Sequence, residues 1–144
     1  MNAIDFLISE HNKVRKTMAD ISDDSHREET KHKLFEELKA DLLRHEEMEQ
    51  TVWYPHFRNH KDLKDTVKHL LVEENGAEKA LKSFDKKMDQ DEWEMKFKKL
   101  KQDVEHHAKE EEKELFPEVK RILDEDTLEK IGKEMREFKQ QYNP

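Results

Sequence analysis

A motif that occurs twice constrains the fold of this chain more than any other feature. The stretches RHEEMEQTVWYP (44–55) and HHAKEEEKELFP (106–117) each place a histidine four residues before a glutamate, and then an aromatic residue followed by proline. The two copies are 62 residues apart. Residues four apart lie one above the other on a helix. Each copy therefore predicts an inward-facing His–Glu pair, and the repeat predicts that one helical unit is used twice.

Apolar residues recur three and four positions apart in four segments, which predicts four amphipathic helices. These segments span residues 4–21, 38–52, 67–88 and 100–115. Each apolar stripe is interrupted near its middle by histidine or glutamate. The chain holds only 2 Gly and 3 Pro, so few residues break its helices. A further amphipathic stretch at residues 126–142 predicts a short fifth helix packed on the others.

The connections between these segments are short and polar, which predicts that successive helices are antiparallel. The connection 22–29 offers Ser and Asp as N-caps for the second helix, and 89–92 offers Asp for the fourth. Pro55 and Pro117 are expected to kink or end the second and fourth helices. The sequence thus predicts an all-α, up-down-up-down four-helix bundle with a short C-terminal fifth helix, as a single domain over residues 1–144.

The composition excludes several classes of protein. With 44% charged and 33% hydrophobic residues and a mean hydropathy of −1.25, the totals alone are typical of a disordered chain, but the regular apolar period argues against disorder. The net charge is −8 and no basic stripe indicates nucleic acid binding. No apolar run is long enough for a membrane span, and no signal peptide is evident. The absence of cysteine excludes a zinc ribbon, a thiol nucleophile and a cysteine-held iron–sulfur cluster, and is compatible with the cytoplasm, which is the location we expect.

Two more polar residues fall in the same helical frame as the repeated pairs. His11 lies 63 residues before Glu74, so the first two helices match the last two as a duplicated hairpin. Three imidazoles and three carboxylates should then meet inside the bundle, where an unpaired carboxylate is costly. Two divalent cations with a bridging hydroxide would balance this charge, as in dinuclear helix bundles. The predicted metal ligands are His11, His45, Glu49, Glu74, His107 and Glu111.

The other polar and aromatic residues near these positions are given simpler roles. His69 and His106 lie on polar helix faces and are expected at the surface, and Glu46, Glu73 and Glu110 are expected to flank the site. The aromatic residues are expected to be core or lid residues: Trp53, Tyr54, Trp93 and Phe116. A set of apolar residues is expected to keep water out of the site: Leu7, Val14, Leu42, Ala77, Leu81 and Val104.

In these motifs the chain resembles the hemerythrin-like HHE cation-binding family. The stretches HEEMEQTVWYP and HAKEEEKELFP resemble the paired motifs of that family, DFLISEHNKV is similar to its first helix, and TLEKIGKEMREFK to its C-terminal helix. The resemblance implies a four-helix bundle with a non-heme dinuclear iron centre. Five of the six predicted ligands match family ligands, whereas Glu74 stands where the family usually has histidine. We prefer Glu74 to His69 because only Glu74 lies on the apolar face.

The resemblance favours two iron ions, oxo- or hydroxo-bridged, although zinc or manganese would accept the same donors. We expect Glu49 and Glu111 to bridge the metals. The other ligands are expected to cap the metals in pairs: His11 with His107, and His45 with Glu74. The leading hypothesis is a protein that binds or senses O2, peroxide, nitric oxide or iron itself. Two alternatives are a di-iron oxidoreductase that turns over O2, peroxide or nitric oxide, and a metal-free helical interaction module.

Overall fold

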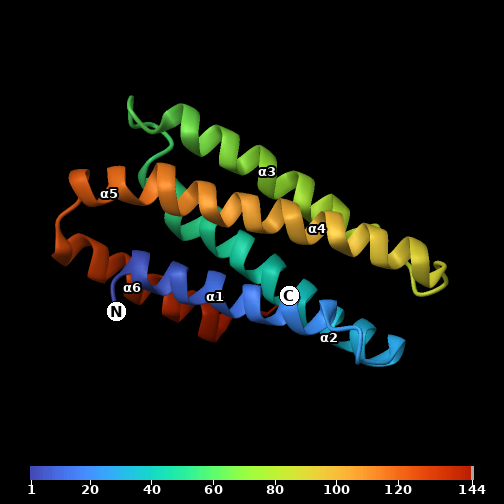
Figure 1. The fold of residues 1–144 in the computed structure, drawn as a ribbon. Coiled ribbons are helices and arrows are strands. Elements are labelled where there is room, and N and C mark those ends of the chain that lie inside the picture. The colour runs from blue at the N-terminus through green and yellow to red at the C-terminus, as the bar shows by residue number, and fades with distance from the viewer. Residues whose placement is uncertain (144) are drawn as a thin grey trace.

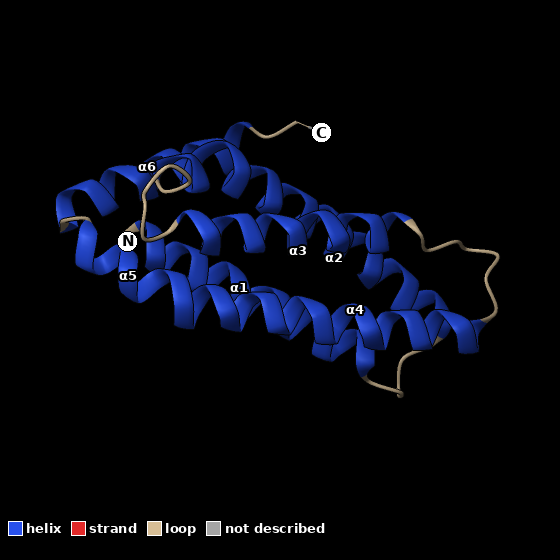
Figure 2. Cartoon of the chain, turned by 90° about the horizontal axis from the view of Figure 1, so that it is seen from above, coloured by secondary structure: helices blue, strands red, loops and turns tan. Residues whose placement is uncertain are grey.

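Helices make up all the regular secondary structure in the computed structural model, which describes residues 1–143 (Figure 2). In Figure 1 the colour gradient runs one way along α1 and α3 and back along α2 and α4. The four long helices are α1 (Ala3–Ser22), α2 (Glu28–Met48), α3 (Lys64–Lys82) and α4 (Gln90–Glu110). The prediction of an all-helical protein is confirmed.

The C-terminal helix lies where the sequence predicts it. Helix α6 (Glu125–Gln141) has 17 residues and agrees with the predicted stretch at 126–142, although with 19 residues in α3 it is not short relative to the long helices. It packs along α1 and also contacts α2 (Figure 1). The contact is close because Gly132 faces the chain start, where an added Cβ would lie 2.9 Å from the backbone nitrogen of Ala3. A side chain at this position would push α6 away from α1.

The helix ends agree with the sequence only in part. The side chain of Asn2 caps α1 and that of Asp124 caps α6 through hydrogen bonds to backbone N–H groups. The predicted Ser or Asp cap of α2 is wrong: the helix follows Arg27, which makes no such bond. Asp89 precedes α4 as predicted, but its side chain makes no capping bond. Helix α3 ends earlier than the predicted segment, so residues 83–88 form a connection.

The interior consists of two apolar clusters with a polar layer between them. One cluster contains residues from the first turns of α1 and α3, from α5 (Phe116–Ile122) and from α6. The other cluster contains residues from the far halves of the four long helices. On α1, Leu7 belongs to the first cluster and Val14 to the second, with buried His11 between them. Full burial of such side chains stabilises the fold by roughly 1.5–3 kcal/mol each. Packed apolar side chains therefore lie on both sides of the polar layer.

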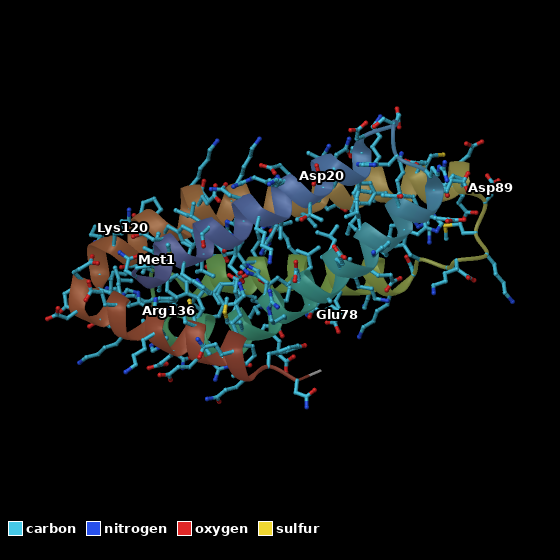
Figure 3. The ribbon with its side chains drawn as sticks, turned by 90° about the horizontal axis from the view of Figure 1, so that it is seen from below. Met1, Asp20, Glu78, Asp89, Lys120 and Arg136 are labelled. Carbon is cyan, nitrogen blue, oxygen red and sulfur yellow. The ribbon has the colours of Figure 1, made fainter. Side chains whose placement is uncertain are left out.

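Charged side chains cover the outside of the bundle. Figure 3 labels Asp20, Asp89 and Lys120 among the residues that project outward, and all three are exposed. No helix within residues 1–143 combines the length and apolar character needed to cross a lipid bilayer.

Candidate metal centre

A π-helical turn begins at the glutamate of each repeat, and the proline that follows favours this turn. The turns are Glu49–Trp53 and Glu111–Leu115. The N–H of Tyr54 donates to the carbonyl of Glu49, five residues back, and Phe116 does the same to Glu111. The proline that follows in each repeat has no N–H and its ring clashes with the normal helical carbonyl, which favours this wider turn. Both glutamates are placed in equivalent local geometry with 0% exposure.

The six predicted side chains converge in the polar layer. Glu74 is 2% exposed, and His11 and His45 are 5% and 6% exposed. Each imidazole turns its Nε2 toward a carboxylate oxygen: His11 lies 3.0 Å from Glu111, His45 2.8 Å from Glu49, and His107 3.2 Å from Glu74. Despite the short distances, several of these buried atoms lack a hydrogen-bond partner: Nε2 of His11 and His45, both oxygens of Glu49, and Oε1 of Glu111.

The convergent atoms form two groups that share one carboxylate. His11, His45 and Glu111 make one group, and the other consists of Glu49, Glu74, His107 and Glu111, each with donor atoms within 4.8 Å of one another. The predicted capping pairs are therefore wrong. His11 pairs with His45, at 5.4 Å between ring centroids, and His107 pairs with Glu74. The reason is that α1 packs mainly on α2, and α3 on α4, so each pair comes from one hairpin.

A carboxylate also contacts the other nitrogen of each imidazole. The Nδ1 distances are 2.7 Å from His11 to Glu112, 3.4 Å from His45 to Glu10, and 3.0 Å from His107 to Glu73. Glu112 and Glu10 are in turn bound by Arg15 and Lys139, both at 3.0 Å. Such outer carboxylates orient the imidazole and raise its basicity as a metal ligand.

Only part of this outer layer of carboxylates was predicted from the sequence. Glu73 was expected beside the site, but Glu10 and Glu112 were missed. Their only signal in the sequence is that each adjoins a predicted ligand, Glu10 next to His11 and Glu112 next to Glu111. In a chain with 36 acidic residues, adjacency alone does not distinguish a partner of histidine from a solvated carboxylate.

Tyr54 belongs to the site and is more than the core or lid aromatic that we expected. Its buried hydroxyl lies 3.0 Å from Oε2 of Glu74 and 2.5 Å from Oε2 of Glu111. Phe116, at the matching place in the second repeat, has no hydroxyl and stacks on His11 with 6.1 Å between ring centroids. The two halves of the repeat therefore differ at this position, and only one brings a donor to the carboxylates.

Burial and crowding perturb the ionisation of these groups. Burial raises the pKa of Glu49 well above its ordinary value, and the charges of Glu111 and Glu74 raise it further. Burial lowers the pKa of His107, but contacts with Glu74 and Glu111 outweigh it and raise the pKa to about 10. For His11 the opposing effects of burial and of its contacts with Glu111 and Glu112 give a pKa of about 9. In the metal-free protein the raised pKa values favour the protonated forms of His11, His107 and Glu49.

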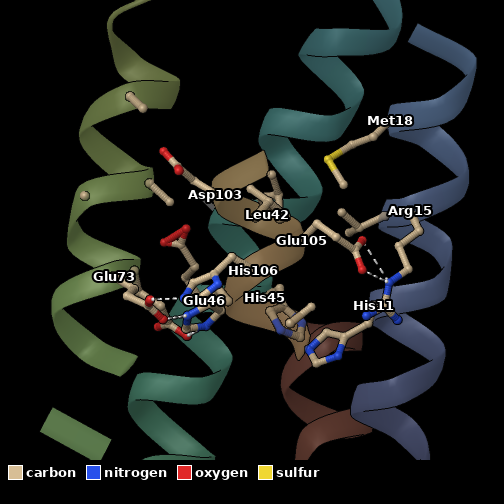
Figure 4. Close-up of a pocket in the computed structure, with 18 of the residues that line it drawn as sticks. His11, Arg15, Met18, Leu42, His45, Glu46, Glu73, Asp103, Glu105 and His106 are labelled. Atoms are coloured by element: carbon tan, nitrogen blue, oxygen red, sulfur yellow. Dashed lines mark hydrogen bonds and ion pairs between the residues drawn. The ribbon is translucent and has the colours of Figure 1, made fainter. Parts of the chain in front are cut away.

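A cavity of about 440 Å³ reaches the candidate centre from the side of α3 and α4 (Figure 4). Its apolar walls come from Val14, Met18, Leu42, Ala77, Ala80 and Val104. Four of the six predicted apolar residues line it, whereas Leu7 and Leu81 lie in the two core clusters instead. Glu46 also faces the cavity; it is 6% exposed and its Oε2 has no hydrogen-bond partner. Burial, and then the charge of Glu74, raises the pKa of Glu46 to about 9.

Comparison with known proteins agrees with this arrangement. Residues 2–119 match the family model described as the hemerythrin HHE cation binding domain, and this range includes all six predicted ligands. No curated protein and no solved structure matches the chain. The match covers most of the sequence, so the chain belongs to the hemerythrin HHE cation-binding family.

Proposed function

We propose that this chain holds two iron ions within an up-down-up-down four-helix bundle and uses them to bind or sense O2 or a related small oxidant. Membership of a cation-binding family supports the metal. The observation that carries the proposal is the set of buried imidazole and carboxylate atoms that face one another without hydrogen-bond partners. Unsatisfied buried polar atoms are costly, and bound cations would remove that cost.

The residues fit such a centre in number and chemistry. His11 and His45 would hold one ion, His107 with Glu74 and Glu49 the other, and Glu111 belongs to both groups. Imidazole and carboxylate donors suit iron, and manganese and zinc accept the same set. When bound, a pair of irons supplies the electrons and the open coordination positions that a small oxidant needs.

The chain itself contributes orientation, exclusion of water and a proton. The outer carboxylates of Glu112, Glu10 and Glu73 fix the rings of the three histidines. The apolar cavity walls leave few groups for water to bind near the centre. The Tyr54 hydroxyl holds a proton between the carboxylates of Glu74 and Glu111.

A second function, turnover of O2, peroxide or nitric oxide, is favoured by the same cavity and by Tyr54. A volume of about 440 Å³ is far larger than the roughly 30 Å³ that one water molecule occupies in the liquid. The cavity therefore has room for a small oxidant with water, or for a larger co-substrate. The buried Tyr54 hydroxyl would hold the carboxylates of Glu74 and Glu111 in place during such a reaction by donating a hydrogen bond to them.

Anaerobic reconstitution with ferrous iron tests the proposal. We expect two irons per chain in the buried centre and a new visible absorption band when O2 is added. A stable band indicates binding, whereas repeated consumption of oxidant at an oxygen electrode indicates turnover. The variant His45→Ala should lose iron, and His56→Ala, which removes an exposed histidine, should keep it. Well under one metal per chain in the folded parent would refute the proposal and favour the metal-free interaction module.

A further inference from the structure

A second cluster of histidine and glutamate lies at the surface, beside the mouth of the cavity. His69 and Glu73 are four residues apart on α3, and His106 and Glu110 are four apart on the neighbouring α4. Each pair therefore lies on one helical face. The imidazoles are 57% and 68% exposed, while the carboxylates of Glu73 and Glu110 are 19% and 22% exposed. Figure 4 shows Glu73 and His106 on facing helices at one side of the pocket.

The four side chains point toward one another. Nε2 of His69 lies 3.0 Å from Oε1 of Glu110 and 3.4 Å from Oε2 of Glu73. Nε2 of His106 lies 3.4 Å from Oε2 of Glu73 and 3.4 Å from Oε2 of Glu110. Donor atoms of His69, Glu73 and Glu110 all fall within 4.8 Å of one another. Oε2 of Glu110 is shielded from solvent and has no hydrogen-bond partner.

The charge of this cluster is not balanced by basic side chains. Within residues 1–143, neither Glu73 nor Glu110 forms an ion pair with lysine or arginine, although the chain has 28 of these residues. Nearby carboxylates on the same helices do so, as in the pair of Glu78 with Lys82 on α3. Two carboxylates with only imidazoles as partners form a donor set of net negative charge that a cation would neutralise.

We propose that His69, Glu73, His106 and Glu110 form a third cation site, which binds one divalent transition-metal ion. Two imidazoles and two carboxylates suit zinc or ferrous iron better than calcium or magnesium, which prefer oxygen donors alone. The exposure of both imidazoles leaves the site open to solvent, so the ion can enter and leave readily. This separates it from the buried centre, where His107 is 16% exposed and the other predicted ligands are 6% exposed or less.

Glu73 joins the outer site to the buried centre. Its Oε2 faces the two outer imidazoles, while its Oε1 lies 3.0 Å from Nδ1 of His107. An ion at the surface would thus be one carboxylate away from a predicted ligand of the inner pair, at the mouth of the cavity that leads to it. The outer site is therefore an entry station from which the inner centre is loaded, and this second part rests on the proposed function.

Zinc titration of the metal-free chain, followed by calorimetry, tests the outer site. We expect the double variant His69→Ala/His106→Ala to bind one equivalent fewer than the parent. The matched control His26→Ala/His56→Ala, which removes two histidines outside both clusters, should bind as many as the parent. Circular dichroism verifies that each variant is folded. Equal stoichiometry and affinity in the parent and the first variant would overturn the outer site.

The outcomes separate this inference from the proposed dinuclear centre. If both hold, the parent binds three ions and the outer variant two; if only the outer site exists, the parent binds one and the variant none. The entry role is tested by the rate of anaerobic ferrous loading, followed by the spectrum that develops with O2. In the outer variant the absorbance of the dinuclear centre is expected to develop more slowly but to reach the same final value, and an unchanged rate would refute the entry role.

Discussion

Replacement of Glu49 by glutamine separates the metal-free state from the loaded state. Both Glu49 oxygens are buried and make no hydrogen bond, and burial with the nearby carboxylates raises the pKa of this group well above its ordinary value. The raised pKa favours the neutral form of the carboxyl in the metal-free protein. Glutamine has nearly the same shape and is also neutral, so Glu49→Gln should change the free energy of unfolding by less than about 1 kcal/mol.

With metal the same substitution removes a charged ligand. Metal at about 1,000 times its dissociation constant stabilises the folded state by about 4.1 kcal/mol. If the loss of Glu49 weakens binding about 100-fold, the same relation leaves about 1.4 kcal/mol. The difference of about 2.7 kcal/mol corresponds to a melting temperature roughly 8 °C lower for a chain of this size. The effect should therefore appear only in the presence of metal.

Thermal unfolding of parent and variant is measured with and without anaerobic ferrous iron. It gives the effect of the substitution on the stability of the metal-free protein and its effect on the stabilisation by metal. The control Glu47→Gln changes an exposed carboxylate on the same helix and should alter neither state. If Glu49→Gln retained the full metal-induced rise in melting temperature, Glu49 would not be a charged metal ligand. A loss of several kcal/mol in the metal-free state alone would also contradict it, because the native carboxyl would then be ionised and paired.

Three further predictions concern the surroundings of the centre and the packing of α6 on α1. Glu112→Gln should weaken metal binding about 10- to 100-fold, measured by competition with a chelator, because it loosens His11; unchanged affinity would remove Glu112 from the account. Tyr54→Phe should lower the stability of the metal-free protein by roughly 1.5–3 kcal/mol in urea unfolding, and an unaffected midpoint would show that its hydrogen bonds contribute nothing. Gly132→Ala should destabilise the protein by roughly 1–3 kcal/mol because the added Cβ meets backbone atoms. Gly76→Ala, with nothing within 4 Å of the added Cβ, should stabilise the protein by roughly 1 kcal/mol. The reverse order of stability would contradict the packing of α6.

Helical periodicity was the most informative signal in the sequence. Because inward positions recur every three or four residues, the frame that contains Leu70 and Leu81 selected Glu74 and rejected His69. The structure agrees, with Glu74 2% and His69 57% exposed. Periodicity also placed His11 and Glu111 at one level, since both helices cross the same polar layer between two apolar clusters.

The details that the sequence did not predict depend on contacts between helices. The frame shows that a residue faces inward, but it does not show which helix lies beside it, so the pairing of His11 with His45 was missed. Pro55 and Pro117 indicated a break in the second and fourth helices. The structure shows instead a wider π turn before each proline, which places a glutamate in the polar layer. The role of Tyr54 depends on where its hydroxyl ends, six bonds from the backbone, and Phe116 at the matching position offered no hint of it.

Anomalous X-ray diffraction from iron-loaded crystals at the iron absorption edge tests the central claim most directly. Two peaks are expected in the polar layer, roughly 3.5–4 Å apart as in other dinuclear sites. One peak should lie against the Nε2 atoms of His11 and His45, and the other against Nε2 of His107, with Glu111 touching both. A single peak in the polar layer, or no peak there, would contradict the presence of a dinuclear centre.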